Sequence, residues 1–260
     1  MQKNKMKTLY VSFMTAIAKL IFPRPNFIFE EEPVEGEPCV FLANHSGADG
    51  PAYATLYFAE PKKMWLINYV VNRDKNADFI FHDFFAAANK KHKKPWRLLA
   101  KITAFFLTPL LESTQHIKVY HDARMLDTFR DSVEALAKGE NLVIFPECPT
   151  GFSPYLNELY SGFSELGRLY YTSCGKLLRF YPTYICKDLK TVSVGKPIIY
   201  DPSVPARKER EIISKKVRDG IVSLAEKLPK HKIHPFLTDE WYECYGEYAD
   251  NPIEYWKKFD

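Results

Sequence analysis

A histidine and two carboxylates occupy positions in this sequence where side chains could move a proton. His45 follows the apolar run 39–43 and Asn44, and Asp49 comes four residues later in a loop of Ser, Gly and Ala. Glu147 stands after a second apolar run and a Phe-Pro pair. An imidazole titrates near neutral pH, and a carboxylate can fix its tautomer and stabilise the imidazolium. These residues predict general-base chemistry; an ordinary polar turn after a strand is the simpler alternative for His45.

A nucleophile supplied by the protein is not evident. The sequence contains no Gly-x-Ser-x-Gly segment, which argues against a serine hydrolase of that type, and Ser46 adjoins His45 without that setting. Cys148 follows Glu147, but an acidic neighbour gives no reason for a lowered thiol pKa, and cysteine is often simply buried. A base without its own nucleophile suits direct transfer, in which the histidine activates a hydroxyl or amine on an acceptor.

The elements that must position these residues alternate along the chain. Short apolar runs rich in β-forming residues are separated by segments of helical period, which predicts an α/β fold with a mostly parallel central sheet and helices on both faces. Side chains at the carboxyl ends of such strands gather at one edge of the sheet. We therefore expect His45 and Glu147 to face one cleft. The expected strands are 39–43, 64–71, 116–120, 141–145, 179–185 and 191–195.

The sequence predicts a single domain, residues 1–260, with three parts. An amphipathic helix is expected within residues 1–24, the core within 39–200, and a helical extension within 201–260. The clearest internal helix lies between Asp122, which can cap it, and Gly139, just past its end. A charged helix is expected at 207–228.

The charge pattern indicates a membrane surface as a partner. The net charge of +4 is too small to imply nucleic acid, and no apolar run approaches the ~20 residues that span a bilayer. Basic residues beside the apolar segment LLAKITAFFLTPLL suit an anionic membrane surface. A buried helix with a solvated basic lead-in is the alternative. The basic residues expected to contact lipid are Lys90, Lys91, Lys93, Lys94 and Arg97.

Cysteine usage bears on the compartment. The chain has five scattered cysteines and no Cys-x-x-Cys pair, so no metal site is predicted, and a reducing compartment is the plainest reading. The lysines before LYVSFMTAIA give the N-terminus some likeness to a signal peptide. Helical spacing continues through that segment to Pro23, which favours an amphipathic helix instead. The expected location is the cytoplasm, peripheral at the inner face of the membrane.

Four segments, in order between residues 39 and 199, carry a resemblance to a known family. They are NHSGADGP from Asn44, the stretch from HIKVY to LVIFPE, the helix SGFSELGRLYY, and the proline-containing strand RFYPTYI. In order, they resemble the blocks of the glycerolipid (lysophosphatidic acid) acyltransferase superfamily. The resemblance implies an α/β fold and an enzyme that moves a fatty acyl chain from a CoA or carrier-protein thioester to an acceptor hydroxyl, with no bound cofactor.

The resemblance also implies roles for individual residues. His45 would be the general base and Asp49 its orienting carboxylate. Residues at the other motif positions would contact a lipid or small-molecule acceptor. These substrate-binding candidates are Asn44, His121, Arg124, Glu147 and Cys148.

Three departures from the family pattern leave other functions open. The family's aspartate falls at Gly50, so that Asp49 stands one residue early and points about 100° away if the segment is helical. His121 occupies the position of a phosphate-binding arginine, and a neutral imidazole lacks the bidentate guanidinium fork, so a phosphate-bearing acceptor is not implied. Cys148 replaces a glycine. Two alternatives remain. The first is a relative of the family that has lost catalysis and binds lipid; in it, Asp at position 50 would restore the family spacing. The second is a thioester hydrolase.

Overall fold

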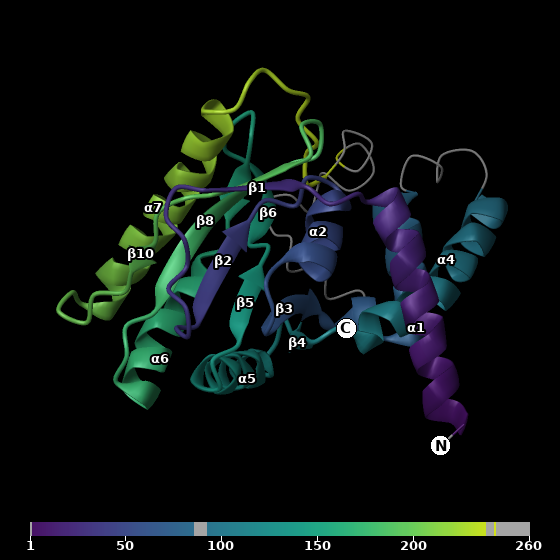
Figure 1. Cartoon of the computed structure of the whole chain (residues 1–260), viewed down its shortest axis with the longest axis horizontal. Coiled ribbons are helices and arrows are strands. Elements are labelled where there is room, and N and C mark those ends of the chain that lie inside the picture. Colours follow the sequence, from purple (N-terminus) through teal and green to yellow (C-terminus); the bar gives the residue numbers. More distant parts are fainter. Residues whose placement is uncertain (1, 86–92, 238–241, 243–260) are drawn as a thin grey trace.

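The computed structural model describes residues 2–85, 93–237 and 242 of the chain (Figure 1). Its centre is an eight-stranded sheet in the order β1-β9-β8-β2-β5-β3-β4, and β10 adds to it by pairing with β8. A separate antiparallel hairpin consists of β6 (Glu147–Gly151) and β7 (Asn157–Leu159). The strands of the main sheet are β1 (Asn26–Phe29), β2 (Cys39–Ala43), β3 (Lys62–Ile67), β4 (His116–Val119), β5 (Asn141–Ile144), β8 (Arg179–Cys186), β9 (Thr191–Val194) and β10 (Ile198–Ile199).

The sheet is mostly parallel. Strands β8, β2, β5, β3 and β4 run in one direction. A hairpin turn reverses the chain between β8 and β9, so β9 and its parallel neighbour β1 run in the opposite direction. The predicted α/β class with a mostly parallel sheet is confirmed, and five strands present their carboxyl ends at the same edge.

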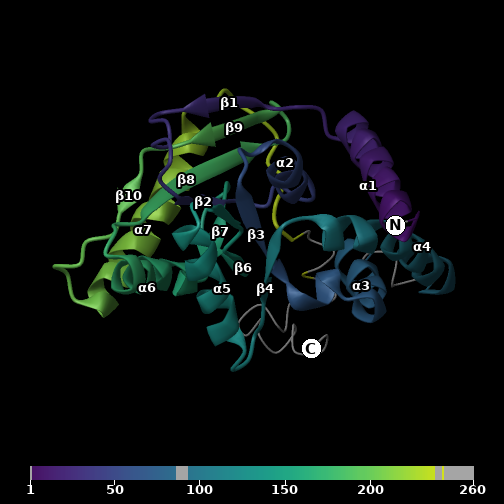
Figure 2. The ribbon, with the colours of Figure 1, turned by 60° about the horizontal axis from the view of Figure 1, so that its bottom comes forward.

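Helices cover both faces of this sheet, as expected. On one face, α5 (Met125–Ala137), α6 (Glu165–Cys174) and α7 (Ala206–Glu226) pack against alternate strand residues, including Val40, Leu42 and Leu142 (Figure 2). On the other face, α2 (Asp49–Tyr57) packs Tyr53 against residues of the opposite parity, including Phe41 and Val143. Because successive strand side chains point to opposite faces, the uninterrupted apolar runs in the sequence serve two cores at once.

Several predicted elements needed correction. The apolar run 64–71 is not one strand: β3 ends at Ile67, and a 3-10 turn, η1 (Asn68–Val71), buries Tyr69 beside the end of the sheet. Asp122 does not cap α5; its Oδ1 accepts the Arg124 N–H at 2.8 Å in the turn before the helix. The strands β1, β6, β7 and β10 were not predicted, because each has only two to five residues and none shows a regular alternation of apolar and polar side chains.

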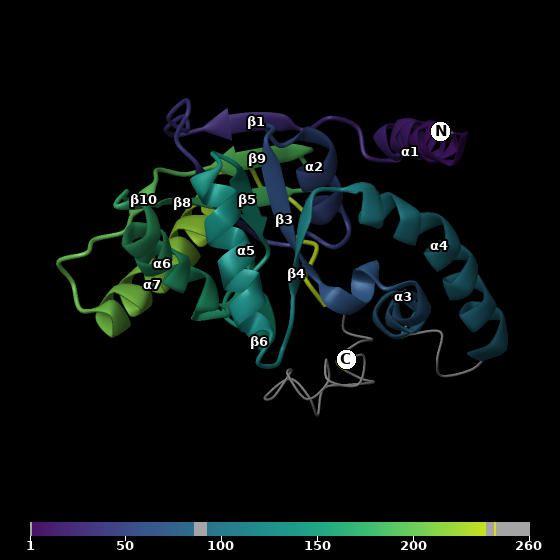
Figure 3. The same ribbon diagram turned by 90° about the horizontal axis from the view of Figure 1, so that it is seen from below.

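A helical group lies at the other end of the molecule from α6 and α7 (Figure 3). It consists of α1 (Gln2–Ile21), α3 (Arg73–Phe79), the short helix η2 (Ile80–Phe84) and α4 (Lys93–Ser113), while the 3-10 turn η4 (Ser161–Ser164) leads into α6. The Tyr10 hydroxyl on α1 donates to the Phe106 carbonyl on α4 at 2.7 Å. Among the helices described, none is both long and apolar enough to cross a bilayer.

Candidate functional site

The candidate site forms where β2 and β5 end side by side. Leu42 of β2 lies opposite Ile144 of β5 in the parallel pairing. His45 and Glu147 each stand three residues beyond that pair, so the register of the two strands brings them to the same height at the carboxyl edge. The two residues were expected to face one cleft, and the structure places them in direct contact.

The contact is made by one carboxylate oxygen. Glu147 Oε2 accepts the main-chain N–H of His45 at 2.6 Å and lies 3.3 Å from the ring nitrogen Nδ1. The other oxygen, Oε1, accepts the Asn157 N–H of the β6–β7 hairpin at 3.3 Å. The Glu147 side chain is only 3% exposed, whereas that of His45 is 20% exposed. Since a carboxylate can only accept, the proton of a neutral imidazole lies on Nδ1, which leaves Nε2 with a free lone pair.

Asn44 connects this edge to the neighbouring strand β8. Its side-chain oxygen accepts the Ile185 N–H at 2.6 Å, and its amide donates to the Ile185 carbonyl at 3.1 Å. Asn44 is only 4% exposed. The side chain that the family resemblance assigned to substrate is therefore engaged by the protein's own backbone, and it fixes the residue immediately before the histidine.

The conformation of the loop after His45 favours glycine at position 47, because of its backbone angle, and at position 50, because of a close approach to the His45 carbonyl. Ser46 and Gly47 both have positive φ, 48° and 64°, so the chain turns sharply into α2. The Gly50 N–H then bonds the His45 carbonyl at 2.9 Å, and a Cβ at Gly50 would lie 2.1 Å from that same oxygen. No side chain fits there without a shift of the backbone. Aspartate at position 50 would therefore disrupt this loop instead of restoring the family's carboxylate.

Asp49 has a different partner from the one suggested by the resemblance. It is buried at the start of α2, and its Oδ2 forms an ion pair with Lys187 Nζ at 2.7 Å. Lys187 comes from the turn between β8 and β9. The carboxylate beside the imidazole is that of Glu147, and Asp49 instead fastens α2 to the end of β8.

Two other substrate-binding candidates lie away from His45. His121 and Arg124 follow β4, which β3 separates from β5, so about 10 Å of strand spacing lies between them and the strand that leads to Glu147. The Arg124 guanidinium pairs with Asp122 at 2.6 Å and covers the Tyr120 ring at 4.4 Å.

Cys148 lies next to Glu147 and is buried. It is 8% exposed, and burial raises the pKa of its thiol. A raised pKa lowers the fraction of reactive thiolate. Burial and a raised thiol pKa therefore favour a structural role for Cys148 over a covalent one.

The structure describes some of the residues expected to contact a membrane. Lys90 and Lys91 lie outside the described residues, and Lys93 begins α4. Lys94 and Arg97 are exposed, with the Arg97 guanidinium 4.9 Å from the centre of the Phe81 ring. The alternative of a wholly buried helix is wrong for α4, because several of its apolar side chains are exposed: Leu98, Leu99, Ile102, Phe105 and Phe106.

Two aromatic rings in contact with His45 were not predicted. The Phe236 ring stacks on the imidazole with centroids 4.2 Å apart and planes 27° apart, and Phe145 lies 5.0 Å away with a 40° tilt. Phe145 could have been found from its place between the strand and Glu147. Phe236 could not, because it arrives from the segment after α7, which has no periodic pattern.

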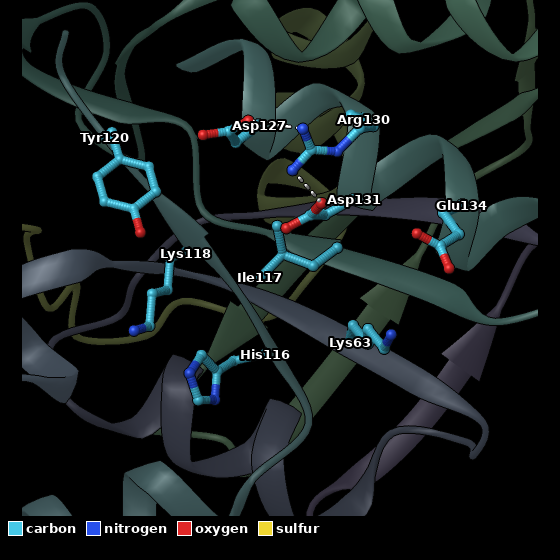
Figure 4. A pocket seen from close by; sticks show the side chains of 9 residues that line it. All are labelled: Lys63, His116, Ile117, Lys118, Tyr120, Asp127, Arg130, Asp131 and Glu134. Atoms are coloured by element: carbon cyan, nitrogen blue, oxygen red, sulfur yellow. Dashed lines mark hydrogen bonds and ion pairs between the residues drawn. The ribbon is translucent and has the colours of Figure 1, made fainter. Parts of the chain in front are cut away.

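One surface pocket lies away from this site. A pocket of about 510 Å³ runs between the outer edge of β4 and α5, and its lining includes His116 and Lys118 (Figure 4). Its charged groups largely neutralise one another: Arg130 pairs with both Asp127 at 2.8 Å and Asp131 at 3.2 Å. Among the described residues, no cluster of His, Cys, Asp or Glu could hold a metal ion.

Comparison with known proteins adds a distant structural likeness. No protein-family profile matches the chain, and no curated protein matches its sequence. Among solved structures, the chain is similar to the 1-acyl-sn-glycerophosphate (LPA) acyltransferase PlsC from Thermotoga maritima, with 14% sequence identity and a TM-score of 0.43. The match covers 88% of this chain and 85% of that one. At this identity and TM-score, the likeness carries no conclusion about activity.

Proposed function

We propose that this protein is an acyltransferase in lipid metabolism that moves a fatty acyl group from a CoA or carrier-protein thioester to an acceptor hydroxyl or amine. The observation that carries the proposal is the contact of His45 Nδ1 with the buried Glu147 carboxylate at the carboxyl edge of the sheet. The same two residues belong to the motifs that resemble the glycerolipid acyltransferases. The residues suited to general-base chemistry are thus the same residues that carry the motif resemblance.

The geometry suits direct transfer. Glu147 holds the imidazole with its proton on Nδ1, so Nε2 can take the proton of an acceptor hydroxyl. The acceptor oxygen then attacks the thioester carbonyl, a C–O bond forms, and the C–S bond breaks. The imidazolium returns its proton to the departing thiolate. Glu147 stabilises the imidazolium while it exists, and no covalent acyl-enzyme is required.

The role of Glu147 in this proposal is to orient the base. Each oxygen of its carboxylate already has a partner in the chain, His45 for Oε2 and the Asn157 N–H for Oε1. Its contact with the imidazole supplies what the family resemblance assigned to Asp49. The acceptor is proposed only as a lipid or small molecule with a hydroxyl or amine.

We further propose that the protein works as a peripheral protein on the cytoplasmic face of a membrane, docked through α1 and α4. Exposed apolar side chains stand on both helices, including Phe13 and Leu20 on α1 and Leu98 and Phe105 on α4. Exposed Lys94 and Arg97 lie on the same helix as the latter pair. Apolar side chains accompanied by basic ones are the features of a helix that lies in the plane of an anionic interface.

The enzymatic proposal is tested with purified protein, radiolabelled palmitoyl-CoA and a panel of lysophospholipids, glycerolipids and long-chain amines. We expect a labelled product with at least one acceptor, and its loss in a His45→Ala variant. Wild-type protein that transfers the acyl group to no acceptor and releases no free fatty acid in a His45-dependent manner would overturn the proposal.

A further inference from the structure

The segment that follows α7 returns to the candidate site. Residues 229–237, here named the strap, are anchored first at His231. Its Nδ1 lies 2.8 Å from the Pro229 carbonyl, and its Nε2 lies 2.9 Å from the Tyr184 hydroxyl of β8. Because the carbonyl can only accept, Nδ1 donates to it and Nε2 accepts the Tyr184 proton. This anchor defines both the tautomer of His231 and the direction in which the strap leaves it.

Two further contacts hold the rest of the strap. The Lys232 N–H donates to the Asp188 carboxylate at 3.0 Å, which ties the strap to the turn between β8 and β9. At the far end, Leu237 is 7% exposed and packs with the fully buried Tyr69 of η1. The strap is thus attached to the end of β8 on one side of His45 and to η1 after β3 on the other.

Phe236 lies between these attachments and covers the base. Its ring is stacked on the imidazole with centroids 4.2 Å apart. It is closer to the imidazole and more nearly parallel to it than the Phe145 ring, whose centroid is 5.0 Å away. The His45 side chain nevertheless remains 20% exposed, which leaves an approach to the imidazole. The Phe236 ring covers one face of the imidazole with apolar surface, so it narrows the space beside the ring in which water can be held.

We propose that Phe236 is a specificity-determining residue that favours transfer to the acceptor over transfer to water. The proposal rests on the acyltransferase function proposed above. Hydrolysis and acyl transfer use the same base: in each, Nε2 of His45 takes a proton from an O–H group, that oxygen attacks the thioester carbonyl, and the C–S bond breaks with the proton passed to the thiolate. The two reactions differ only in which hydroxyl reaches the base. An apolar cover offers a water molecule beside the imidazole no hydrogen-bond partner, whereas an acceptor with an apolar chain can pack against the ring.

The cover is tested first without any assay of activity. Diethyl pyrocarbonate carbethoxylates accessible imidazoles, and mass spectrometry of the His45 peptide gives the rate at that site. Phe236→Ala should raise this rate about three- to tenfold, the range expected when one aromatic contact is lost. Phe236→Tyr should keep the wild-type rate. Ile233→Ala is the matched control, because Ile233 is on the same strap and has no ring to stack, and it should change nothing. An unchanged rate in Phe236→Ala overturns the proposal.

The second measurement is the partition of radiolabelled palmitoyl-CoA between acceptor product and free palmitate. Phe236→Ala should raise the ratio of palmitate to product about three- to tenfold, whereas Phe236→Tyr and Ile233→Ala keep it. A structural defect alone would lower both products together, and an unchanged ratio would contradict the proposal. A third outcome is that Phe236→Ala exposes His45 to the reagent but neither the wild type nor any variant cleaves the thioester. The proposed enzymatic function then fails, and the specificity role of Phe236 fails with it. Only the shielding of His45 by Phe236 would remain supported.

Discussion

One oxygen of Glu147 serves both the backbone and the ring of His45: Oε2 lies 2.6 Å from the His45 main-chain nitrogen and 3.3 Å from Nδ1. The first contact fixes where the histidine leaves β2, and the second fixes the plane and tautomer of its ring. A single buried carboxylate thereby determines both the position and the protonation pattern of the base. Substitutions at the two residues should for this reason have linked effects.

Removal of the base or of its carboxylate should abolish most acyl transfer. His45→Ala should lower kcat by about 10²–10⁴, the usual contribution of a general base. Glu147→Gln should lower kcat by about two orders of magnitude, because an amide can present a donor to Nδ1 and so reverse the tautomer. Both are measured with radiolabelled palmitoyl-CoA and the best acceptor.

Asp49→Asn provides the matched comparison for Glu147→Gln. Asp49 pairs with Lys187, so loss of its charge should lower kcat less than about fivefold, the scale of a partly exposed ion pair. An Asp49→Asn variant that is as inactive as Glu147→Gln would show that Asp49, and not Glu147 alone, supports the base.

The contrast between Glu147 and Asp49 shows what the sequence could and could not predict. Parallel strands place their carboxyl ends at one edge, so two polar groups after apolar runs could be assigned to one cleft without a structure. Which carboxylate reaches Nδ1 depends on the register of β2 and β5, in which Leu42 faces Ile144. Register arises from long-range pairing, and local spacing within NHSGADGP could not supply it.

Phe236 and Gly50 illustrate two other limits. Phe236 reaches His45 from a segment without periodic pattern, so only the folded chain brings the two rings together. In the sequence, Gly50 stands where the family motif has an aspartate. The backbone shows it as a position where a Cβ would strike the His45 carbonyl, which is a property of one loop conformation and not of residue type.

Asn44 should contribute to stability through the backbone of β8. In Asn44→Ala, the buried N–H and carbonyl of Ile185 both lose their partner. Each unsatisfied group costs about 1–3 kcal/mol, so the free energy of unfolding should fall by about 3 kcal/mol in urea denaturation. Asn26→Ala, at an exposed position of β1, is the control and should change it by less than about 0.5 kcal/mol. Equal stability of the two variants would contradict the bridging role of Asn44.

Gly50 should tolerate no side chain. Gly50→Ala places a Cβ 2.1 Å from the His45 oxygen, so the loop must move, and we expect a loss of about 1–3 kcal/mol in thermal denaturation together with a fall in His45-dependent activity. Gly162→Ala is the comparison, since a Cβ there meets nothing within 4 Å. If Gly50→Ala is as stable and as active as the Gly162 variant, the loop conformation after His45 is not the one described.

Binding to anionic vesicles should depend on the exposed apolar face of α4. Leu98 and Phe105 are 61% and 74% exposed, and insertion of such side chains into lipid contributes about 1.5–3 kcal/mol each. Leu98→Glu and Phe105→Glu should each weaken co-sedimentation with phosphatidylcholine–phosphatidylglycerol vesicles roughly tenfold or more. The matched control is Leu126→Glu on α5, where the leucine is 75% exposed at a distance from α4. Binding that survives the α4 changes, or fails equally in the control, would exclude docking through this face.

His234 should make the strap sensitive to acid. Burial lowers the pKa of His234 below its ordinary value of 6.5, and the cations Lys187 and Lys232 lower it further, against weaker opposite effects of Asp49 and Asp188. Well above pH 6.5 the residue is neutral in both folded and unfolded chains and has no effect on stability. As the pH falls from 6.5 through the lowered pKa, the unfolded chain takes up the proton first, so the folded state loses stability. The thermal midpoint of the wild type should therefore be lower below this pH window than above it. The difference should be smaller in His234→Gln.

The comparison variant for this pH effect is His116→Gln. His116 lies on the edge strand β4, where its Nδ1 is 2.9 Å from the Thr114 carbonyl, and it has no place in the strap. Its replacement should leave the wild-type decline unchanged. The strap carries Phe236, so the same acidification should also raise the ratio of palmitate to acceptor product in the wild type and raise it less in His234→Gln. A decline in midpoint that is identical in all three proteins would show that His234 is not the group whose protonation loosens this part of the fold.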